Sequence, residues 1–333
     1  MFRADAKSLI GTGDLVSLIH LSRYFEVDNW ETHFIVRDNF VAIEITKKYG
    51  VVKTQLIDRD MSVKDETDLL NNYINDNYIN VIFFEITERP LIDYVGITND
   101  VIKACITFDG VIPQNIDLVV NWNPCSHGIF DKDRYPNTTF LLGPEYVVLP
   151  IIFNSDTIRS RKYSDKPERL LITMGGTDEY NITQKVVDTL EINRSNLLIT
   201  IILGVGYEFK RELLKSLTSS NLRYEIKENV TNMFDEYMAC DVAIGSGGLT
   251  LYEMIASRTP AIIISSEEHQ VERCKHFAEK GWIKYLGFRD FDHAALMGII
   301  YEPFQVTHKS VSNTNIIVEK VNSLIGYTHS ICQ

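Results

Sequence analysis

The strongest structural signal in this chain is the stretch Ile244-Gly245-Ser246-Gly247-Gly248-Leu249-Thr250-Leu251-Tyr252-Glu253. It follows an apolar run, Asp241 to Ile244, that is typical of a buried strand, and it continues into a helical pattern. Glycines let a backbone approach a ligand closely, and the first N–H groups of a helix lack partners within the helix. The stretch therefore predicts a strand–turn–helix unit in which Ser246, Gly247 and Gly248 surround a diphosphate and Glu253 accepts hydrogen bonds from a ribose diol.

A second glycine turn, Met174-Gly175-Gly176-Thr177-Asp178, follows the apolar run Leu170 to Thr173 and precedes a helix expected from about Thr183. Taken alone, this turn is better explained as a tight strand-to-helix connection with no ligand. Two glycine-rich turns of this kind in one half of the chain are harder to explain by packing. Together they favour a site at which backbone N–H groups hold phosphate oxygens.

Polar residues follow a third apolar run, Ala261 to Ile264, at positions 265–270. The carboxyl ends of parallel strands form the edge at which ligands bind. His269 would by itself be an ordinary surface histidine, but on that edge it becomes a candidate. The predicted nucleotide-binding residues of this half are Gly175, Gly176, Thr177, Asp178, Ser246, Gly247, Gly248, Leu249, Thr250, Glu253, Glu268, His269 and Gln270.

A glycine turn near the N-terminus, Ile10-Gly11-Thr12-Gly13-Asp14, precedes a helical pattern from Leu15 to Phe25. Gly11 and Gly13 are candidates for the same kind of close ligand contact. Asp14 has two interpretations that the sequence leaves open. It is either an N-cap that accepts backbone N–H groups or a carboxylate directed at a reacting group. The turn lacks the third glycine of the dinucleotide-binding fingerprint.

Short apolar runs alternate with longer helical patterns along the chain, which is typical of parallel strands buried on both faces. After a short N-terminal strand, the runs are 33–36, 51–57, 81–84, 104–108, 118–120, 139–142, 169–173, 198–203, 223–226, 241–244 and 261–264. We therefore predict an α/β chain of two doubly wound domains, 1–153 and 168–333. The polar stretch 154–167 is the expected linker, and the last helix can pack back on the first domain.

The composition excludes several function classes. The 333 residues are 45% hydrophobic and 23% charged, which is typical of a globular protein, and the net charge of −12 argues against a nucleic-acid or anionic-membrane surface. No apolar run reaches the roughly 18 residues of a spanning helix, and the charged start, Met1 to Asp5, lacks the apolar core of a signal peptide. The five cysteines show no Cys-x-x-Cys spacing, so we expect reduced thiols in a cytoplasmic protein.

The order of motifs resembles the UDP-sugar hydrolase of pseudaminic acid biosynthesis (PseG) and its spore-coat, SpsG-like relatives. The resemblance rests on Phe2-Arg3-Ala4-Asp5-Ala6 with Ile10-Gly11-Thr12-Gly13, Thr107-Phe108-Asp109, Leu142-Gly143-Pro144-Glu145-Tyr146, the turns at 172–178 and 243–250, and Glu268-His269-Gln270. That family is similar to the lipid-II-forming glycosyltransferase MurG and has the GT-B fold, two Rossmann-like domains facing a cleft. The resemblance implies that the C-terminal domain binds the nucleotide diphosphate and that the N-terminal domain supplies catalysis.

This chain differs from the family at the positions that are expected to carry out the reaction. The family has Gly-x-Gly-His with a catalytic histidine, and this chain has Asp14 at that position. The family's arginine three residues later is Ser17, and its Asp-Ser-Tyr is Glu85-Ile86-Thr87. Its Tyr-x-Leu-Leu-Arg run becomes Tyr146 to Pro150, without the arginine. The motifs expected to bind the nucleotide match the family, whereas the residues expected to take part in the reaction differ from it.

Three functions are compatible with this pattern. Some inverting GT-B glycosyltransferases resemble this chain in having Gly-Asp at this turn, with the aspartate proposed as base. The first prediction is therefore an inverting glycosyltransferase of bacterial surface glycan biosynthesis (nonulosonic or pseudaminic type), with Asp14 as base and a UDP- or CMP-sugar as donor. The second is a PseG-like nucleotide-sugar hydrolase in which Asp14 activates water. The third is an inactive nucleotide-sugar-binding protein in which Asp14 only caps a helix.

We expect neither a cofactor nor a metal requirement. The Asp-x-Asp motif of metal-dependent glycosyltransferases does not follow a strand of the expected nucleotide-binding half, and helix N-termini can hold phosphates instead. Asp58-Arg59-Asp60 has that spacing, but it lies in the N-terminal half and is interpreted as a solvated loop.

Overall fold

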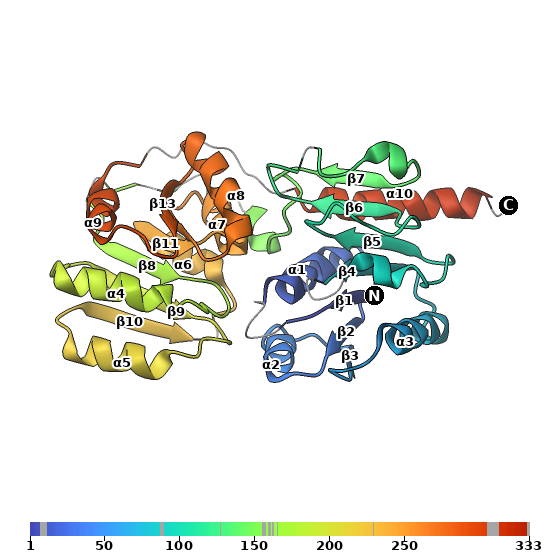
Figure 1. The fold of residues 1–333 in the computed structure, drawn as a ribbon, viewed down its shortest axis with the longest axis horizontal. Coiled ribbons are helices and arrows are strands. Elements are labelled where there is room, and N and C mark those ends of the chain that lie inside the picture. The colour runs from blue at the N-terminus through green and yellow to red at the C-terminus, as the bar shows by residue number, and fades with distance from the viewer. Residues whose placement is uncertain are drawn as a thin grey trace. The chain divides into compact units, whose positions relative to one another are not determined.

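The computed structural model describes residues 1–6, 12–86, 90–126, 128–154, 158, 161, 163–164, 166–228, 230–304 and 313–331. The chain divides into two compact units, which are described separately (Figure 1). The first unit is Met1–Pro150 with Ser312–Gln333, and the second unit is Ile151–Val311. This division assigns residues 151–167 to the second unit and the C-terminal helix to the first. A linker over 154–167 stays a prediction.

The described residues of the first unit form a sheet of seven parallel strands in the order β3-β2-β1-β4-β5-β6-β7. The strands are β1 (Phe2–Ala4), β2 (Phe34–Arg37), β3 (Thr54–Ile57), β4 (Val81–Glu85), β5 (Ile102–Ile106), β6 (Leu118–Asn121) and β7 (Thr139–Leu142). The helices are α1 (Gly13–Val27), α2 (Phe40–Lys48), α3 (Val63–Asp76) and α10 (Asn315–Ile331), with short 3-10 turns η1 (Leu91–Tyr94) and η2 (Lys132–Arg134).

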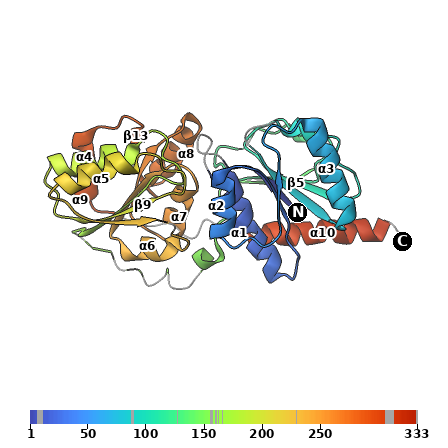
Figure 2. The same cartoon turned by 90° about the horizontal axis from the view of Figure 1, so that it is seen from below.

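Alternate side chains of the central strands enter two different cores. Phe2 of β1 and Phe83 of β4 pack against Phe25 of α1, with ring centroids 5.9 and 5.6 Å from it. Phe84, the next residue of β4, packs on the opposite face in a cluster with Leu70 of α3. Figure 2 shows α1 and α10 on one face of this sheet and α3 on the other. This alternation explains why β4 is apolar at every position up to Glu85.

The described residues of the second unit form a sheet of six parallel strands in the order β10-β9-β8-β11-β12-β13. The strands are β8 (Arg169–Thr173), β9 (Leu198–Leu203), β10 (Arg223–Glu228), β11 (Val242–Ser246), β12 (Ala261–Ser265) and β13 (Lys284–Phe288). The helices are α4 (Ile182–Ile192), α5 (Lys210–Ser219), α6 (Met233–Ala239), α7 (Leu249–Ala256), α8 (Glu268–Glu279) and α9 (His293–Tyr301), and the 3-10 turn η3 (Ile151–Asn154) precedes them.

The second sheet is also covered on both faces. Leu170 and Ile172 of β8 share one core with Val186 of α4, Leu213 of α5 and Leu296 of α9. Helices α6 and α7 lie on the opposite face (Figure 2). Both units thus have the Rossmann-like architecture that the alternation of apolar runs and helices predicted.

Every strand expected from an apolar run is present, and among the described residues one further strand, β13, was not expected. Strand β13 has the sequence Lys284-Tyr285-Leu286-Gly287-Phe288 and lies at the edge of the second sheet, where its residues are half-buried or exposed. An edge strand has one neighbour and need not be uniformly apolar, so the criterion of a continuous apolar run does not detect it.

The strand order places the predicted turns together. Strands β8, β11 and β12 are neighbours and parallel, so the turns that follow them share the carboxyl edge of the second sheet. Strands β1 and β4 are neighbours in the first sheet, so α1 begins close to the end of β4. The two groups of predicted site residues are built on these two edges.

Candidate functional site

The three turns of the second unit lie side by side. Gly247 donates its backbone N–H to Oε1 of Gln270 at 3.2 Å, which joins the β11–α7 turn to the β12–α8 turn. The hydroxyl oxygen of Ser246 lies 3.6 Å from the position that a Cβ on Gly175 would occupy, so the β8–α4 turn is the third member. Residues that are up to 95 positions apart along the chain, Gly175 and Gln270, thus border one surface.

The β8–α4 turn depends on glycine for two reasons. Gly175 has a φ of +84°, a conformation that glycine adopts without strain. The connection after β9 also packs directly on this turn: a Cβ on Gly204 would lie 2.3 Å from the carbonyl oxygen of Gly176, and Gly206 donates its N–H to that oxygen at 2.9 Å. The sequence analysis missed this supporting turn, although Gly204-Val205-Gly206 directly after a strand is a detectable signal.

Asp178 supports the turn from inside. Its two carboxylate oxygens accept the backbone N–H groups of Ile182 and Thr183, each at 2.8 Å, at the start of α4. Burial raises the pKa of Asp178 above its ordinary value, and the hydrogen bonds from Thr183 and Ile182 oppose that rise. Its acceptor oxygens are therefore already engaged with the protein, which is the geometry of a capping residue.

The β11–α7 turn presents a helix start without a side-chain cap. Gly248 is the N-cap residue of α7, and it has no side chain with which to accept the first N–H groups. Ser246, Gly247 and Thr250 are buried, while Gly248 and Leu249 are partly exposed. An anion at this position could accept the N–H groups that a capping side chain would otherwise satisfy, and the positive end of the helix dipole favours it.

Glu253 lies in α7 and is held by a buried tyrosine. The hydroxyl group of Tyr237 in α6 donates to Oε2 of Glu253 at 2.8 Å. The hydroxyl of Thr250 interacts in turn with the Tyr237 oxygen. Burial, followed by the charge of Glu253, raises the pKa of Tyr237 well above its ordinary value, so the phenol remains a donor. Glu253 itself is only half-buried, and Oε2 is oriented by this contact. Tyr237 was not identified from the sequence, because a tyrosine in a short helix carries no functional signal of its own.

The β12–α8 turn contributes one interior residue and two exposed ones. Gln270 is buried, and its Oε1 accepts the N–H of Ser266 at 3.0 Å as well as that of Gly247. Glu268 and His269 are exposed on the same edge. Gln270 therefore connects two turns, whereas Glu268 and His269 are placed to meet a ligand.

A buried arginine lies behind the β11–α7 turn. Arg273 of α8 is 4% exposed and donates from Nη1 to the carbonyl oxygen of Gly247 at 3.2 Å. Its guanidinium carbon is 5.7 Å from the ring centroid of Tyr252. This positive charge adds to the helix terminus at a turn that is predicted to bind phosphate. The sequence analysis did not single out Arg273, because a lone arginine in an amphipathic helix is ordinary.

In the first unit, Asp14 is the second residue of α1 and is half-buried. The N-cap of α1 is Thr12, so the interpretation of Asp14 as the helix cap is wrong. A carboxylate in the first helical turn still interacts favourably with the helix dipole. Gly13 is the first residue of α1 and is exposed, and Gly11 lies outside the described residues.

Glu85, the last residue of β4, lies beside the first turns of α1. Ser17 contacts Oε2 of Glu85 with its hydroxyl group, and the same hydroxyl lies 3.1 Å from the backbone oxygen of Asp14. Burial, and next the negative charge of Asp14, raise the pKa of Glu85 well above its ordinary value, while the contact with Ser17 opposes the rise. The structure thus brings together Asp14, Ser17 and Glu85, three positions at which the sequence departs from the family pattern.

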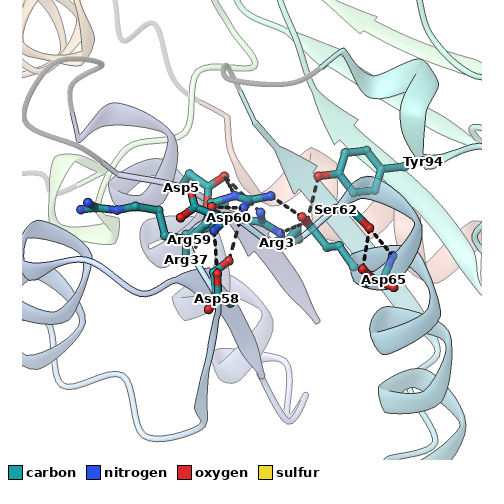
Figure 3. Close-up of polar contacts among 11 residues, drawn as sticks. Arg3, Asp5, Arg37, Asp58, Arg59, Asp60, Ser62, Asp65 and Tyr94 are labelled. Carbon is teal, nitrogen blue, oxygen red and sulfur yellow. Dashed lines mark hydrogen bonds and ion pairs between the residues drawn. The ribbon is translucent and has the colours of Figure 1, made fainter.

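A buried network of charges supports the ends of β1 and β2 (Figure 3). Arg3 donates to Asp5 at 2.6 Å and to Glu66 of α3 at 2.7 Å. Arg37 binds Glu66 as well, and its Nη1 donates to the backbone oxygen of Arg59 at 2.6 Å. The ion pair between Arg3 and Asp5 gives these two residues of the N-terminal motif a structural role. Residues 58–60 form an exposed loop, as predicted, and the Arg59 side chain points away from the network (Figure 3).

Three further properties concern only the described residues. No group of three or more His, Cys, Asp or Glu side chains among them is arranged to hold a metal ion. None of the helices that they form combines the length and the apolar character needed to cross a bilayer. Cys105, Cys125, Cys240 and Cys274 are free thiols.

Comparison with protein families and curated proteins gives three matches. Residues 170–315 match the glycosyltransferase family 28 C-terminal domain. The spore coat polysaccharide biosynthesis protein SpsG of Bacillus subtilis is 27% identical over 298 residues, which are 85% of this chain and 82% of that protein. An uncharacterized protein of Methanocaldococcus jannaschii is 27% identical over 228 residues, which are 65% of this chain. The matched region spans only 46% of that archaeal protein.

Solved structures share the fold over nearly the whole chain. MurG of Acinetobacter baumannii aligns with a TM-score of 0.64 and 13% identity, covering 97% of this chain and 99% of MurG. The UDP-GlcNAc 2-epimerase of M. jannaschii aligns with a TM-score of 0.61 and 12% identity, covering 98% and 99%. The family 28 match and the similarity to SpsG support a glycosyltransferase-type enzyme of the PseG/SpsG-like group, and the solved structures show that the chain has the two Rossmann-like domains of the GT-B fold.

Proposed function

We propose that the chain is an inverting glycosyltransferase that uses a pyrimidine nucleotide sugar, UDP- or CMP-linked, in the biosynthesis of a bacterial surface glycan of the nonulosonic or pseudaminic type. The observation that carries the proposal is the contact of three strand-to-helix turns at one edge of the second sheet, beside the oriented carboxylate of Glu253. The relation to a spore coat polysaccharide biosynthesis protein supports the assignment to glycan assembly.

The second unit is proposed to bind the nucleotide. Gly175, Gly176, Gly247 and Gly248 expose backbone where phosphate oxygens can approach, and the uncapped start of α7 offers N–H groups to them. With Tyr237 on Oε2, Glu253 can accept hydrogen bonds from the two hydroxyls of a ribose. UDP or UDP-GlcNAc is present in the solved complexes of two proteins that share this fold, a rice protein and the Neisseria meningitidis epimerase, which supports uridine as one candidate base.

The first unit is proposed to supply the base. An acceptor hydroxyl attacks the anomeric carbon of the donor sugar, and a new carbon–oxygen bond forms there. The bond from that carbon to the nucleotide phosphate breaks, and its electron pair leaves with the phosphate. The proton of the acceptor hydroxyl passes to the carboxylate of Asp14. Backbone N–H groups, the helix start of α7 and the nearby Arg273 stabilise the charge that develops on the leaving group.

A nucleotide-sugar hydrolase is the second candidate, because the same carboxylate could take a proton from water. The observation that bears on it is Ser17, which stands beside Asp14 where the hydrolase family has an arginine. A hydroxyl cannot provide the charged, bidentate contact that an arginine gives a sugar or phosphate group. This difference favours the transferase.

The test is incubation of the purified protein with a panel of UDP- and CMP-sugars, with and without glycan acceptors, while nucleotide release is followed. Release that requires an acceptor supports the transferase, and equal release without acceptor supports the hydrolase. Turnover is expected to persist after EDTA treatment, because helix starts hold the phosphates in this proposal and the charge of Arg273 adds to them. Absence of both release and nucleotide binding across the panel would contradict the proposed function.

A further inference from the structure

Glu85 and Ser17 form a contact that depends on where one proton lies. Glu85 is 4% exposed, and its Oε2 touches the hydroxyl oxygen of Ser17. Ser17 is fully buried and also lies 3.1 Å from the backbone oxygen of Asp14. A serine hydroxyl has one proton, so it can donate to one of these two oxygens only. When Ser17 donates to the Asp14 carbonyl, its contact with Glu85 is a hydrogen bond only if Glu85 is the donor.

Among the described residues of the neighbouring strands β1 and β5, no cationic side chain pairs with Glu85. Ala4 of β1 pairs with Glu85 across the sheet, and Arg3, the residue before it, turns to the opposite face and binds Glu66. Lys103 of β5 donates instead to the backbone oxygen of Thr98 and to Asn99. An ionised Glu85 would therefore have no charge partner on these strands to offset its burial.

The helices on this face add one interacting negative charge. Within the described part of the chain, Asp14 of α1 is the charged group that interacts with Glu85. His20, one turn after Ser17, is uncharged at neutral pH, because burial and nearby cations lower its pKa to about 3. Helix α10 also packs on β5 and α1, and its two charged side chains in the described part are Glu319, which is exposed, and Lys320, which is half-buried.

Glu66 provides a comparison within the same unit. It is as deeply buried as Glu85, but its carboxylate accepts from Arg3 and Arg37, and Tyr94 donates to it at 2.8 Å. Two guanidinium groups compensate the burial of a carboxylate charge there. Among the described residues, the groups that interact with the Glu85 carboxyl are a hydroxyl and a second carboxyl group. Two buried glutamates on opposite faces of one sheet thus have opposite electrostatic surroundings.

We propose that Glu85 carries a proton at neutral pH and that, through the contact of Ser17 with the backbone oxygen of Asp14, it positions Asp14. Two adjacent carboxyl groups cannot both ionise readily, so the pair carries one negative charge. The charge resides on Asp14, because Asp14 is half-exposed and lies at a helix start, whereas Glu85 is enclosed. Glu85 is a positioning residue in this arrangement. Its role in positioning rests on the proposed function, whereas its protonation does not.

The protonation is tested without substrate by comparing the wild type with Glu85→Gln in urea unfolding between about pH 4 and pH 8. In the unfolded chain Glu85 ionises near its ordinary value of 4.5, whereas the folded protein retains the proton. The wild type therefore loses stability relative to Glu85→Gln as the pH rises above that value. The ratio of their folding equilibrium constants should change roughly tenfold per pH unit until Glu85 ionises in the folded state. A ratio that is independent of pH, or that changes in favour of the wild type, would overturn the proposal.

Glu66→Gln is the matched control, because it removes a carboxylate from two arginines and should destabilise the protein at neutral pH. Infrared spectroscopy gives a second measurement on the wild type: the carbonyl stretch of a protonated carboxyl group, absent from Glu85→Gln. If Glu85→Gln does not fold, Glu85→Asp should shift that band. A wild-type spectrum without such a band at neutral pH would also overturn the proposal.

The positioning role of Glu85 is tested separately by measuring kcat and KM. Leucine at position 85 cannot donate to Ser17, whereas the amide of glutamine can. We expect Glu85→Leu to lower kcat by a factor on the order of 10², with little change in KM, and Glu85→Gln to recover part of that loss. Equal kcat losses in both variants would contradict positioning through the hydrogen bond. A chain that shows no turnover would contradict the proposed function, and the unfolding and infrared results would still decide the protonation.

Discussion

The phenol oxygen of Tyr237 lies 2.8 Å from Oε2 of Glu253. Tyr237 is fully buried in α6, and Glu253 is half-buried in α7, so an interior donor orients a carboxylate that reaches the surface. A hydrogen bond to a charged acceptor is stronger than one between neutral groups, and its enclosed donor cannot be replaced by water. The contact gives Glu253 a defined orientation before any ligand arrives, which reduces the entropy lost on binding.

Tyr237→Phe removes this hydrogen bond and keeps the ring. We expect affinity for UDP to fall about tenfold, which corresponds to ~1.4 kcal/mol, because Glu253 must then be oriented on binding. Isothermal titration calorimetry with UDP and with 2′,3′-dideoxy-UDP separates this effect from general damage. The wild type and the variant should bind the dideoxy compound alike. A loss of the same size for both ligands would show that Tyr237 does not act through the ribose contact.

Glu253→Ala removes the carboxylate altogether. Loss of two hydrogen bonds to the ribose should weaken nucleotide binding by ~1–3 kcal/mol, measured by calorimetry with UDP and CMP. Glu272→Ala is a suitable control, because Glu272 is an exposed glutamate of α8 that pairs with Lys275. It should leave the affinity unchanged. If the wild type bound neither nucleotide, the assignment of the second unit would fail.

Asp14→Asn separates the base from a structural role. Asparagine is nearly isosteric and neutral, so stability should change by less than ~1 kcal/mol, the usual size of the interaction between a carboxylate and a helix dipole. Turnover should fall by a factor on the order of 10²–10⁴, the usual contribution of a positioned base. Thermal unfolding and nucleotide release are the two measurements. Full turnover in Asp14→Asn would exclude Asp14 as the base.

Asp14→His restores the residue of the hydrolase family without its arginine. We expect no efficient hydrolysis, because Ser17 cannot orient a sugar or its attacking water as an arginine would. The measurement is nucleotide release in the absence of acceptor. Rapid acceptor-independent release by this variant would show that the histidine alone determines the hydrolase activity.

Gly204→Ala tests the support of the β8–α4 turn. The added Cβ would lie 2.3 and 2.5 Å from the carbonyl oxygens of Gly176 and Gly175, so the turn must move. We expect a loss of ~1–3 kcal/mol in the free energy of unfolding and weaker nucleotide binding. Gly298→Ala is the control, because no atom lies within 4 Å of its Cβ and Gly298 is inside α9. It should gain ~0.5–1 kcal/mol. Equal effects at the two glycines would contradict the packing argument.

Much of the fold could be predicted because both sheets are parallel and buried on both faces. Runs such as 169–173 and 198–203 are mostly apolar for that reason, and the strands have those bounds. Strand β13 was missed because an edge strand is under a weaker constraint. The glycine turns were detectable because close backbone approach and positive φ values restrict the residue type, as at Gly175.

The roles of single carboxyl groups could not be read from the sequence in the same way. Asp14 has the right residue type for a helix cap, yet Thr12 occupies that position, because a sequence pattern locates the start of a helix only to within a few residues. Asp178 has the residue type of a ligand, yet its oxygens hold the start of α4.

The sequence by itself determined the alternation of buried strands and helices and the positions of the glycine turns, since both follow from local periodicity and backbone conformation. It also showed that Asp14, Ser17 and Glu85 differ from a family pattern, but it did not show that these three residues lie together in the fold. Only the tertiary structure decided that Glu85 meets Ser17 and Asp14 while Glu66 meets two arginines. The physical reason is that the ionisation of a buried carboxyl group depends on the charges around it, and strand order and side-chain alternation choose those neighbours.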